Sequence, residues 1–174
     1  MKLAARLISL YFIIFILPSS VLGGNCNDEE LENLGMLDKP HPDKERLFKT
    51  SKGMTEVGKK HGIKMGTSID KFLSELQKLF GQVGISGVGE ECLRCFAASI
   101  HCVSNKCKGA CLRGPCTDDC QKCIERNCKG ALLECIGKPK IPNPCDWKDE
   151  YLKFKFPTTD SDKSEKKGEA SGTS

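Results

Sequence analysis

Cysteine density is the feature that most constrains the fold of this chain. Ten of its 12 cysteines lie within 44 residues, from Cys92 to Cys135, and the other two lie outside that region. Such density is typical of secreted proteins, in which disulfides replace part of a large apolar core. We therefore expect every cysteine to be oxidised. The predicted half-cystines are Cys26, Cys92, Cys95, Cys102, Cys107, Cys111, Cys116, Cys120, Cys123, Cys128, Cys135 and Cys145.

The start of the chain predicts entry into the secretory pathway, which is an oxidising environment. Two basic residues precede an apolar run over 7–17, and residues 21–23 form a cleavage site, so residues 1–23 are predicted to be a signal peptide. A signal retained as an anchor is the alternative, although a membrane span needs about 20 apolar residues. We expect secretion and no other membrane span. Removing the signal reduces the formal charge of +4 by its two basic residues, to +2, which does not indicate nucleic acid as partner.

Composition divides the rest of the chain into segments. Residues 24–66 are acidic and then basic, and glycine and proline interrupt them, so we expect this segment to be loosely ordered. Residues 67–81 carry apolar side chains at helical spacing, which predicts an amphipathic helix. A glycine-rich linker follows over 82–89. The polar residues 158–174 predict a disordered tail.

The cysteine-rich domain over 90–157 contains an internal repeat with a period of 21 residues. Three cysteines and a Lys-Gly-Ala tripeptide recur in the same register over 95–112 and 116–133. The cysteine spacings place several of these side chains on one side of a helix. We therefore predict a mainly α fold: a small disulfide-rich module of two cystine-stapled α-hairpins, preceded by the amphipathic helix and flanked by disordered tails.

Cysteine positions alone do not determine the pairing. The bridges favoured by symmetry about each predicted turn are Cys102–Cys107, Cys123–Cys128 and Cys116–Cys135. The two outlying cysteines, Cys26 and Cys145, can pair with each other and tie the ends of the module together.

An aromatic strap follows the last cysteine. Leu152, Phe154 and Phe156 alternate with lysines, which is the period of a half-buried strand. We expect this strap to close the fold. The alternative is an exposed contact patch, with Trp147 and Tyr151 as candidate binding residues.

No pattern in the sequence favours catalysis or metal binding. Two Cys-x2-Cys pairs, at 92–95 and 120–123, have the spacing of zinc or thiol-redox sites, but the signal and the other cysteines favour disulfides. Residues 92–102 resemble the start of invertebrate-type lysozymes, yet 96–101 contain no carboxylate to act as general acid. We therefore expect no enzyme activity, no metal and no cofactor.

A basic stretch is the first candidate contact surface. Residues 39–64 contain eight basic side chains against three acidic ones. Such a stretch can hold sulfated glycans or anionic lipid head groups, and a solvated arm is the alternative. The candidate contacts to an anionic glycan are Lys49, Lys52, Lys59, Lys60 and Lys64.

The repeats are the second candidate surface. The loop over 112–115 joins them, and Arg113 lies within it, while Lys108 and Lys129 occupy equivalent positions in the two copies. Residues 92–145 are similar in make-up to small cysteine-rich secreted proteins of parasites, including adhesive proteins of apicomplexans.

A rigid disulfide core presents its surface without an ordering cost on binding. We therefore expect a secreted, non-enzymatic binding or adhesion protein whose partner is an extracellular or host protein. The alternatives are an inhibitor or toxin-like effector and, less favoured, an extracellular enzyme.

Overall fold

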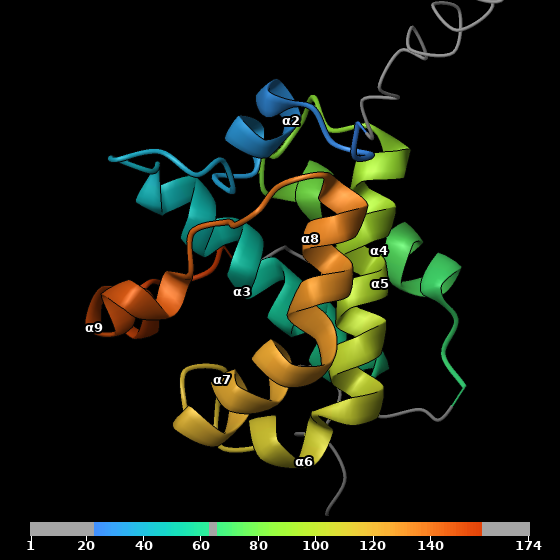
Figure 1. Cartoon of the computed structure of the whole chain (residues 1–174), viewed down its shortest axis with the longest axis vertical. Helices are drawn as coiled ribbons and strands as arrows, with labels where there is room; N and C mark the ends of the chain where they lie inside the picture. The colour runs from blue at the N-terminus through green and yellow to red at the C-terminus, as the bar shows by residue number, and fades with distance from the viewer. Residues whose placement is uncertain (1–22, 63–65, 158–174) are drawn as a thin grey trace, which may run out of the picture.

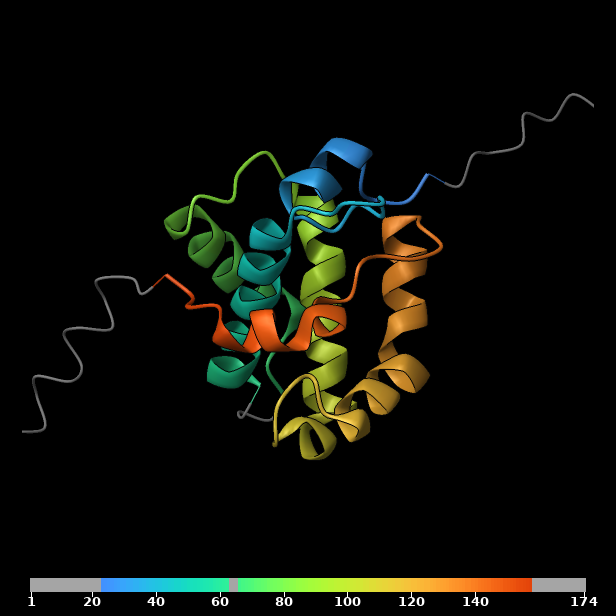
Figure 2. The ribbon, with the colours of Figure 1, turned by 90° about the vertical axis from the view of Figure 1, so that its left-hand side faces the viewer.

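The computed structural model describes residues 23–62 and 66–157, and these form a mainly helical, disulfide-rich module, as predicted. No β-strand occurs in these two ranges. The central element is α5, Glu90–Lys106, which contacts α3, α4 and α8. Figure 2 shows α8 on one side of α5 and the α3–α4 pair on the other. Residues 1–22, which are all but the last residue of the predicted signal, and the predicted tail over 158–174 lie outside the described ranges.

The amphipathic helix predicted near residue 70 is confirmed as α4, Ile69–Gln82. The Ser68 hydroxyl accepts a hydrogen bond from the Lys71 amide and caps the first turn. The buried face consists of Phe72, Leu73, Leu76 and Phe80. The glycine-rich segment that follows turns back toward α5, and Gly84 and Gly87 have positive φ angles that favour glycine.

The basic segment predicted to be loosely ordered is instead largely helical, and this expectation was wrong. Helix α3, Lys44–His61, begins after Asp43, whose carboxylate accepts from the Arg46 amide. Its glycines allow close packing. A Cβ atom at Gly53 would lie 2.9 Å from the Phe80 ring, and one at Gly58 would lie 3.4 Å from Ile100. Glycine at position 53 therefore permits α4 to approach α3, whereas the distance at Gly58 is close to ordinary van der Waals contact.

The N-terminal segment forms a short helix, and the residues before this helix contact the backbone of residues 135–137. Helix α2, Asp28–Asn33, begins with a capping box, in which Asn27 and Glu30 exchange hydrogen bonds. The Asn25 amide donates to the carbonyl of Cys135 at 2.8 Å. Beside it, a Cβ atom at Gly24 would lie 2.1 Å from the Gly137 nitrogen, so the two backbones touch.

Six disulfides join all twelve cysteines, which confirms that the cysteines are oxidised but corrects every predicted pair. The bridges are Cys26–Cys92, Cys95–Cys135, Cys102–Cys128, Cys107–Cys123, Cys111–Cys120 and Cys116–Cys145. Four of them are nested about one turn, so they form a ladder between two antiparallel helical segments. The two sequence repeats are therefore bonded to each other, and neither closes on itself.

The ladder produces one long hairpin where two short ones were expected. The outgoing arm is α5 followed by α6, Lys108–Cys111. The returning arm consists of α7, Asp118–Ile124, the π-helical turn η1, Glu125–Lys129, and α8, Gly130–Ile136. Figure 1 shows the two arms side by side, with α6 and α7 at the closed end.

The π-helical turn has a clear physical role. Cys123 and Cys128 are five residues apart, which in an α-helix would separate their directions by about 140°. A π-turn bonds each residue to the fifth residue along and brings such a pair closer to one face. In the outgoing arm the same spacing recurs between Cys102 and Cys107, and there the helix breaks at Cys107. Each irregularity directs a cysteine toward the opposite arm.

The aromatic strap is helical as far as Lys153, and residues 154–157 form neither helix nor strand, so the predicted strand was wrong. Residues Pro144–Trp147 form the 3₁₀ turn η2, and Lys148–Lys153 form α9. Tyr151 is buried, with its ring centroid 5.4 Å from that of Phe48, and Phe154 packs on the same ring at 5.8 Å. Leu152, between them, is 51% exposed, so the alternation did not mark a buried face. The strap does close the fold, against α3.

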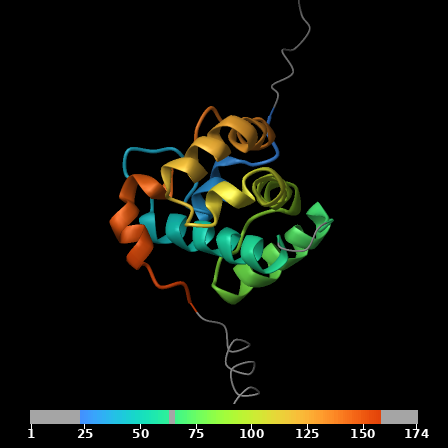
Figure 3. The ribbon, with the colours of Figure 1, turned by 90° about the horizontal axis from the view of Figure 1, so that it is seen from below.

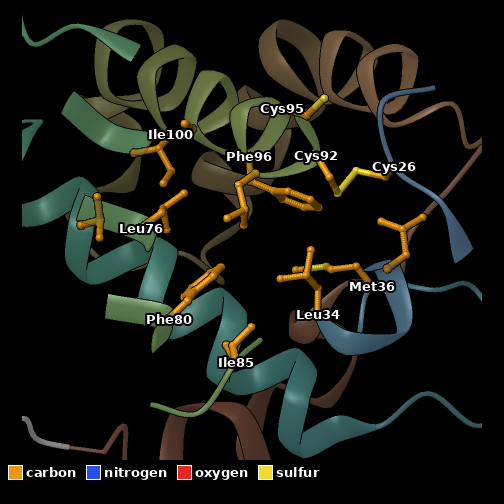
Figure 4. Close-up of a cluster of buried hydrophobic side chains, with 14 of the residues drawn as sticks. Cys26, Leu34, Met36, Leu76, Phe80, Ile85, Cys92, Cys95, Phe96 and Ile100 are labelled. Atoms are coloured by element: carbon orange, nitrogen blue, oxygen red, sulfur yellow. A yellow bond between two sulfur atoms is a disulfide. The ribbon is translucent and has the colours of Figure 1, made fainter. Parts of the chain in front are cut away.

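The core lies between α5 and the helices that precede it. Phe96 of α5 is fully buried, and Figure 4 shows it between side chains of α4 and the Cys26–Cys92 disulfide. Leu34 and Met36, which follow α2, enter the same cluster. The hairpin's closed end lies away from this core, and it is there that cystines carry most of the cross-linking.

Candidate binding surface at the closed end of the hairpin

The turn over 112–117 closes the hairpin and faces the viewer in Figure 3. The Gly114 amide donates to the carbonyl of Cys111 at 3.0 Å, and the Thr117 hydroxyl donates to the carbonyl of Gly114 at 3.1 Å. The side-chain amide of Gln121 donates to the carbonyl of Pro115 at 2.7 Å. These bonds fix the path of the turn from within.

Two disulfides hold the same turn from outside. Cys111 is bonded to Cys120, directly across the hairpin, and Cys116 is bonded to Cys145, at the start of the strap. The backbone between these anchors is therefore preorganised, and a partner that binds it avoids most of the cost of ordering a loop.

The two side chains at the apex are exposed. Leu112 is 78% exposed, more than any other large apolar side chain in the described ranges. The Arg113 side chain is 77% exposed, and its guanidinium forms an ion pair of 2.5 Å with Asp119. Exposed ion pairs of this kind contribute about 0–1 kcal/mol. The apex therefore combines an apolar and a cationic contact on a rigid base.

The structure does not make Lys108 and Lys129 equivalent. Lys108 is exposed in α6, next to the Cys107–Cys123 bridge, while Lys129 lies beside Cys102–Cys128 and pairs with Glu125 at 2.8 Å. The two sequence repeats lie in antiparallel arms. Residues that match in the repeat therefore lie at different distances from the closed end of the hairpin.

Trp147 and Tyr151 of the strap do not form the exposed contact patch that was the alternative prediction. Tyr151 is buried, and burial raises the pKa of its hydroxyl above the usual value, while a hydrogen bond with Thr55 partly opposes this shift. Trp147 is half-buried, with the Lys44 ammonium 5.3 Å from its ring centroid. Both side chains serve the contact between the strap and α3.

The fold pairs most of the basic stretch with carboxylates or rings. Lys49 pairs with Glu45, and Lys59 pairs with Glu56. The Lys52 ammonium lies 4.8 Å from the centroid of the Tyr151 ring. Outside the candidate set, Lys39 and Lys44 pair with Glu32 and Glu150 from other segments. The exposed candidate Lys60 has no ion pair among the described residues, and Lys64 lies outside them.

The residues with metal-site or redox spacing are all in disulfides, and neither Cys-x2-Cys pair is bonded internally. In the described ranges, no group of three histidine, cysteine or carboxylate side chains is arranged to hold a metal ion. His101 contacts Asn105 through its Nε2 atom at 3.0 Å and packs edge-on against Phe72. None of the helices described is long and apolar enough to cross a membrane.

Two concave sites among the described residues lie away from the apex. A polar cavity of about 290 Å³ lies between α3 and the segment after α4, lined by residues that include Asn33, Asp43, Arg46 and Ser86. A second, more open hollow of about 560 Å³ lies around residues 23–28 and Gly137. The rigid apex is the better candidate for a contact surface, because it projects exposed side chains from a fixed backbone.

Comparison of the chain with protein-family models, with curated proteins and with solved structures gives no match.

Proposed function

We propose that this chain is a secreted, non-enzymatic binding protein that contacts an extracellular or host protein through the closed end of its hairpin. One observation carries the proposal: Leu112 and Arg113 are exposed side by side on a backbone fixed by Cys111–Cys120 and Cys116–Cys145. A leucine supplies apolar area, and the planar guanidinium forms several hydrogen bonds at once. A fixed backbone adds affinity because little order is lost on binding.

The shape of the turn bears on the inhibitor alternative. Leu112 has φ −57° and ψ −35°, and the Gly114-to-Cys111 hydrogen bond closes a turn around Arg113. Peptides that line a cleft as an added strand are extended, so this turn does not have the shape of a substrate. The geometry therefore supports an adhesive contact better than insertion into a protease cleft.

A double variant, Leu112→Ser with Arg113→Ala, tests the proposal. We expect the labelled mature protein to bind cultured cells or matrix-coated plates and the variant to bind at least about tenfold more weakly, as for a central interface residue. The free energy of unfolding should change by less than about 0.5 kcal/mol, since both side chains are exposed.

The matched control is Leu152→Ser with Lys153→Ala, which removes a leucine and a cation from the exposed side of α9. Its binding should equal that of the unchanged protein. Equal binding by both double variants, or no binding by the unchanged protein, would reject the closed end as the contact surface.

A further inference from the structure

Basic side chains without carboxylate partners also occur outside the 39–64 stretch, in which the sequence concentrates positive charge. The fold supplies acidic or aromatic partners to most of the 39–64 stretch, as described above. At the closed end of the hairpin, by contrast, Lys106, Lys122 and Arg126 are exposed and form no ion pair with any described residue.

These three cations lie around one disulfide. Lys106 and Lys122 each directly precede a half-cystine of the Cys107–Cys123 bridge, whose Cα atoms are 5.7 Å apart. Since consecutive Cα atoms are 3.8 Å apart, the two lysine Cα atoms lie within about 13 Å of each other. The Cys123 sulfur also contacts the Lys106 carbonyl at 3.6 Å. Arg126 is four residues beyond Lys122, about one helical turn away.

The local charge balance is positive. Residues 105–129 contain six basic side chains against three acidic ones, and two of those acids are occupied by Arg113 and Lys129. The whole chain after residue 23 has a formal charge of only +2. The closed end is therefore more positive than the rest of that chain taken together, and a local excess of one sign attracts a polyanion.

We infer that the cations around the Cys107–Cys123 bridge, Lys106, Lys122 and Arg126, form a binding site for sulfated glycans. The inference rests on the proposed function and adds a second partner class, beside the protein, for the same end of the molecule. The bridge fixes the spacing of the two lysine backbones. The cations therefore stay close together, although they repel one another, until an anionic ligand neutralises their charge.

A glycan fits these charges better than an anionic membrane. A flat membrane would meet the apex first, where Asp118 and Asp119 follow the turn and Arg113 is already paired. Carboxylates there repel anionic lipid, and a single leucine supplies little apolar area for insertion. The unpaired cations lie further along the hairpin, where a chain of sulfates can follow them.

Heparin binding by the full mature chain tests this site. Lys106→Ser, Lys122→Ser and Arg126→Ser together should weaken binding at 0.15 M salt by about tenfold or more. The matched control is Lys148→Ser, Lys153→Ser and Lys155→Ser, which removes three exposed cations that also form no ion pair with described residues. It should retain nearly all the affinity, since its cations lie at α9.

Each outcome has a separate meaning. An equal loss of heparin affinity in both triple variants would mean that only the net charge of the protein matters, and it would overturn the site. Absence of heparin binding by the unchanged protein would also overturn it. Binding of the unchanged protein to phosphatidylserine vesicles without heparin binding would replace the glycan with a membrane. Unchanged heparin affinity in the closed-end triple variant, together with cell binding lost in the apex double variant, would reject the glycan site and leave the proposed function standing.

Discussion

Replacing Phe96 with alanine should lower the free energy of unfolding by about 3–5 kcal/mol, the usual cost of deleting a buried phenylalanine ring. The side chain is fully buried where α5 meets α4 and the Cys26–Cys92 disulfide, so no solvent fills the space that it leaves. Denaturant unfolding of the oxidised protein, followed by circular dichroism, measures the change. Only a small part of the loss should be recovered by local collapse, because disulfides limit how far α5 can move.

Leu112→Ala is the control for that measurement. Leu112 is 78% exposed, so its truncation should change the free energy of unfolding by less than about 0.5 kcal/mol. If Phe96→Ala were as mild as this control, the core would not be centred on α5, and the packing described above would be incorrect.

Removing the Cys26–Cys92 bridge, by changing both cysteines to alanine, should cost roughly 4 kcal/mol in the chain-entropy model. This disulfide joins residues 66 apart in the sequence, and no other bridge shortens the loop that it closes. It also fixes the segment around α2 to the core. Thermal and denaturant unfolding of the double variant, with the other five bridges intact, give the value.

Cys111–Cys120 is the comparison that tests the entropic account. Its two cysteines are only 9 residues apart, and the same model assigns this bridge roughly 2.5 kcal/mol. The long-range bridge should therefore contribute more than the short one by between about 1 and 2 kcal/mol. The reverse order would mean that local strain or residual structure, rather than loop closure, determines what each disulfide contributes.

Local sequence signals predicted the elements whose stability is mostly local. The apolar spacing that predicts α4 is contained within a few residues, and the helix was confirmed. Likewise, the density of cysteine predicted full oxidation, because that depends on redox environment and number rather than on tertiary geometry.

The order of the cysteine spacings contains a second pattern, which predicts the disulfide pairing better than the repeat does. From Cys95 the spacings are 7, 5 and 4 residues as far as Cys111, and from Cys120 they are 3, 5 and 7 as far as Cys135. This near-mirror order is what two antiparallel arms joined by rungs require. The 21-residue repeat and the mirror-image order of spacings each account for the positions of several cysteines. Only the mirror-image order gives the observed ladder.

Helix α3 was missed because its glycines have a tertiary purpose. In sequence, Gly53, Gly58 and Gly62 are helix-weakening residues in a polar segment. In the structure the first two lie where Phe80 and Ile100 approach the helix backbone. The charge of 39–64 is also partly neutralised in the fold, since Glu32 pairs with Lys39 from nearby and Glu150 pairs with Lys44 from the far end of the chain. The error over α3 arises from contacts between segments far apart in the chain, whereas the predicted glycan contact of 39–64 stays a prediction.

The most direct test of the single laddered hairpin is a disulfide map of the native, unreduced protein by proteolysis and mass spectrometry. The structure predicts peptides linked through Cys95–Cys135, Cys102–Cys128, Cys107–Cys123 and Cys111–Cys120. Links within each repeat, Cys102–Cys107 and Cys123–Cys128, would contradict the ladder, and with it the rigid closed end on which the proposed contact and the glycan site depend.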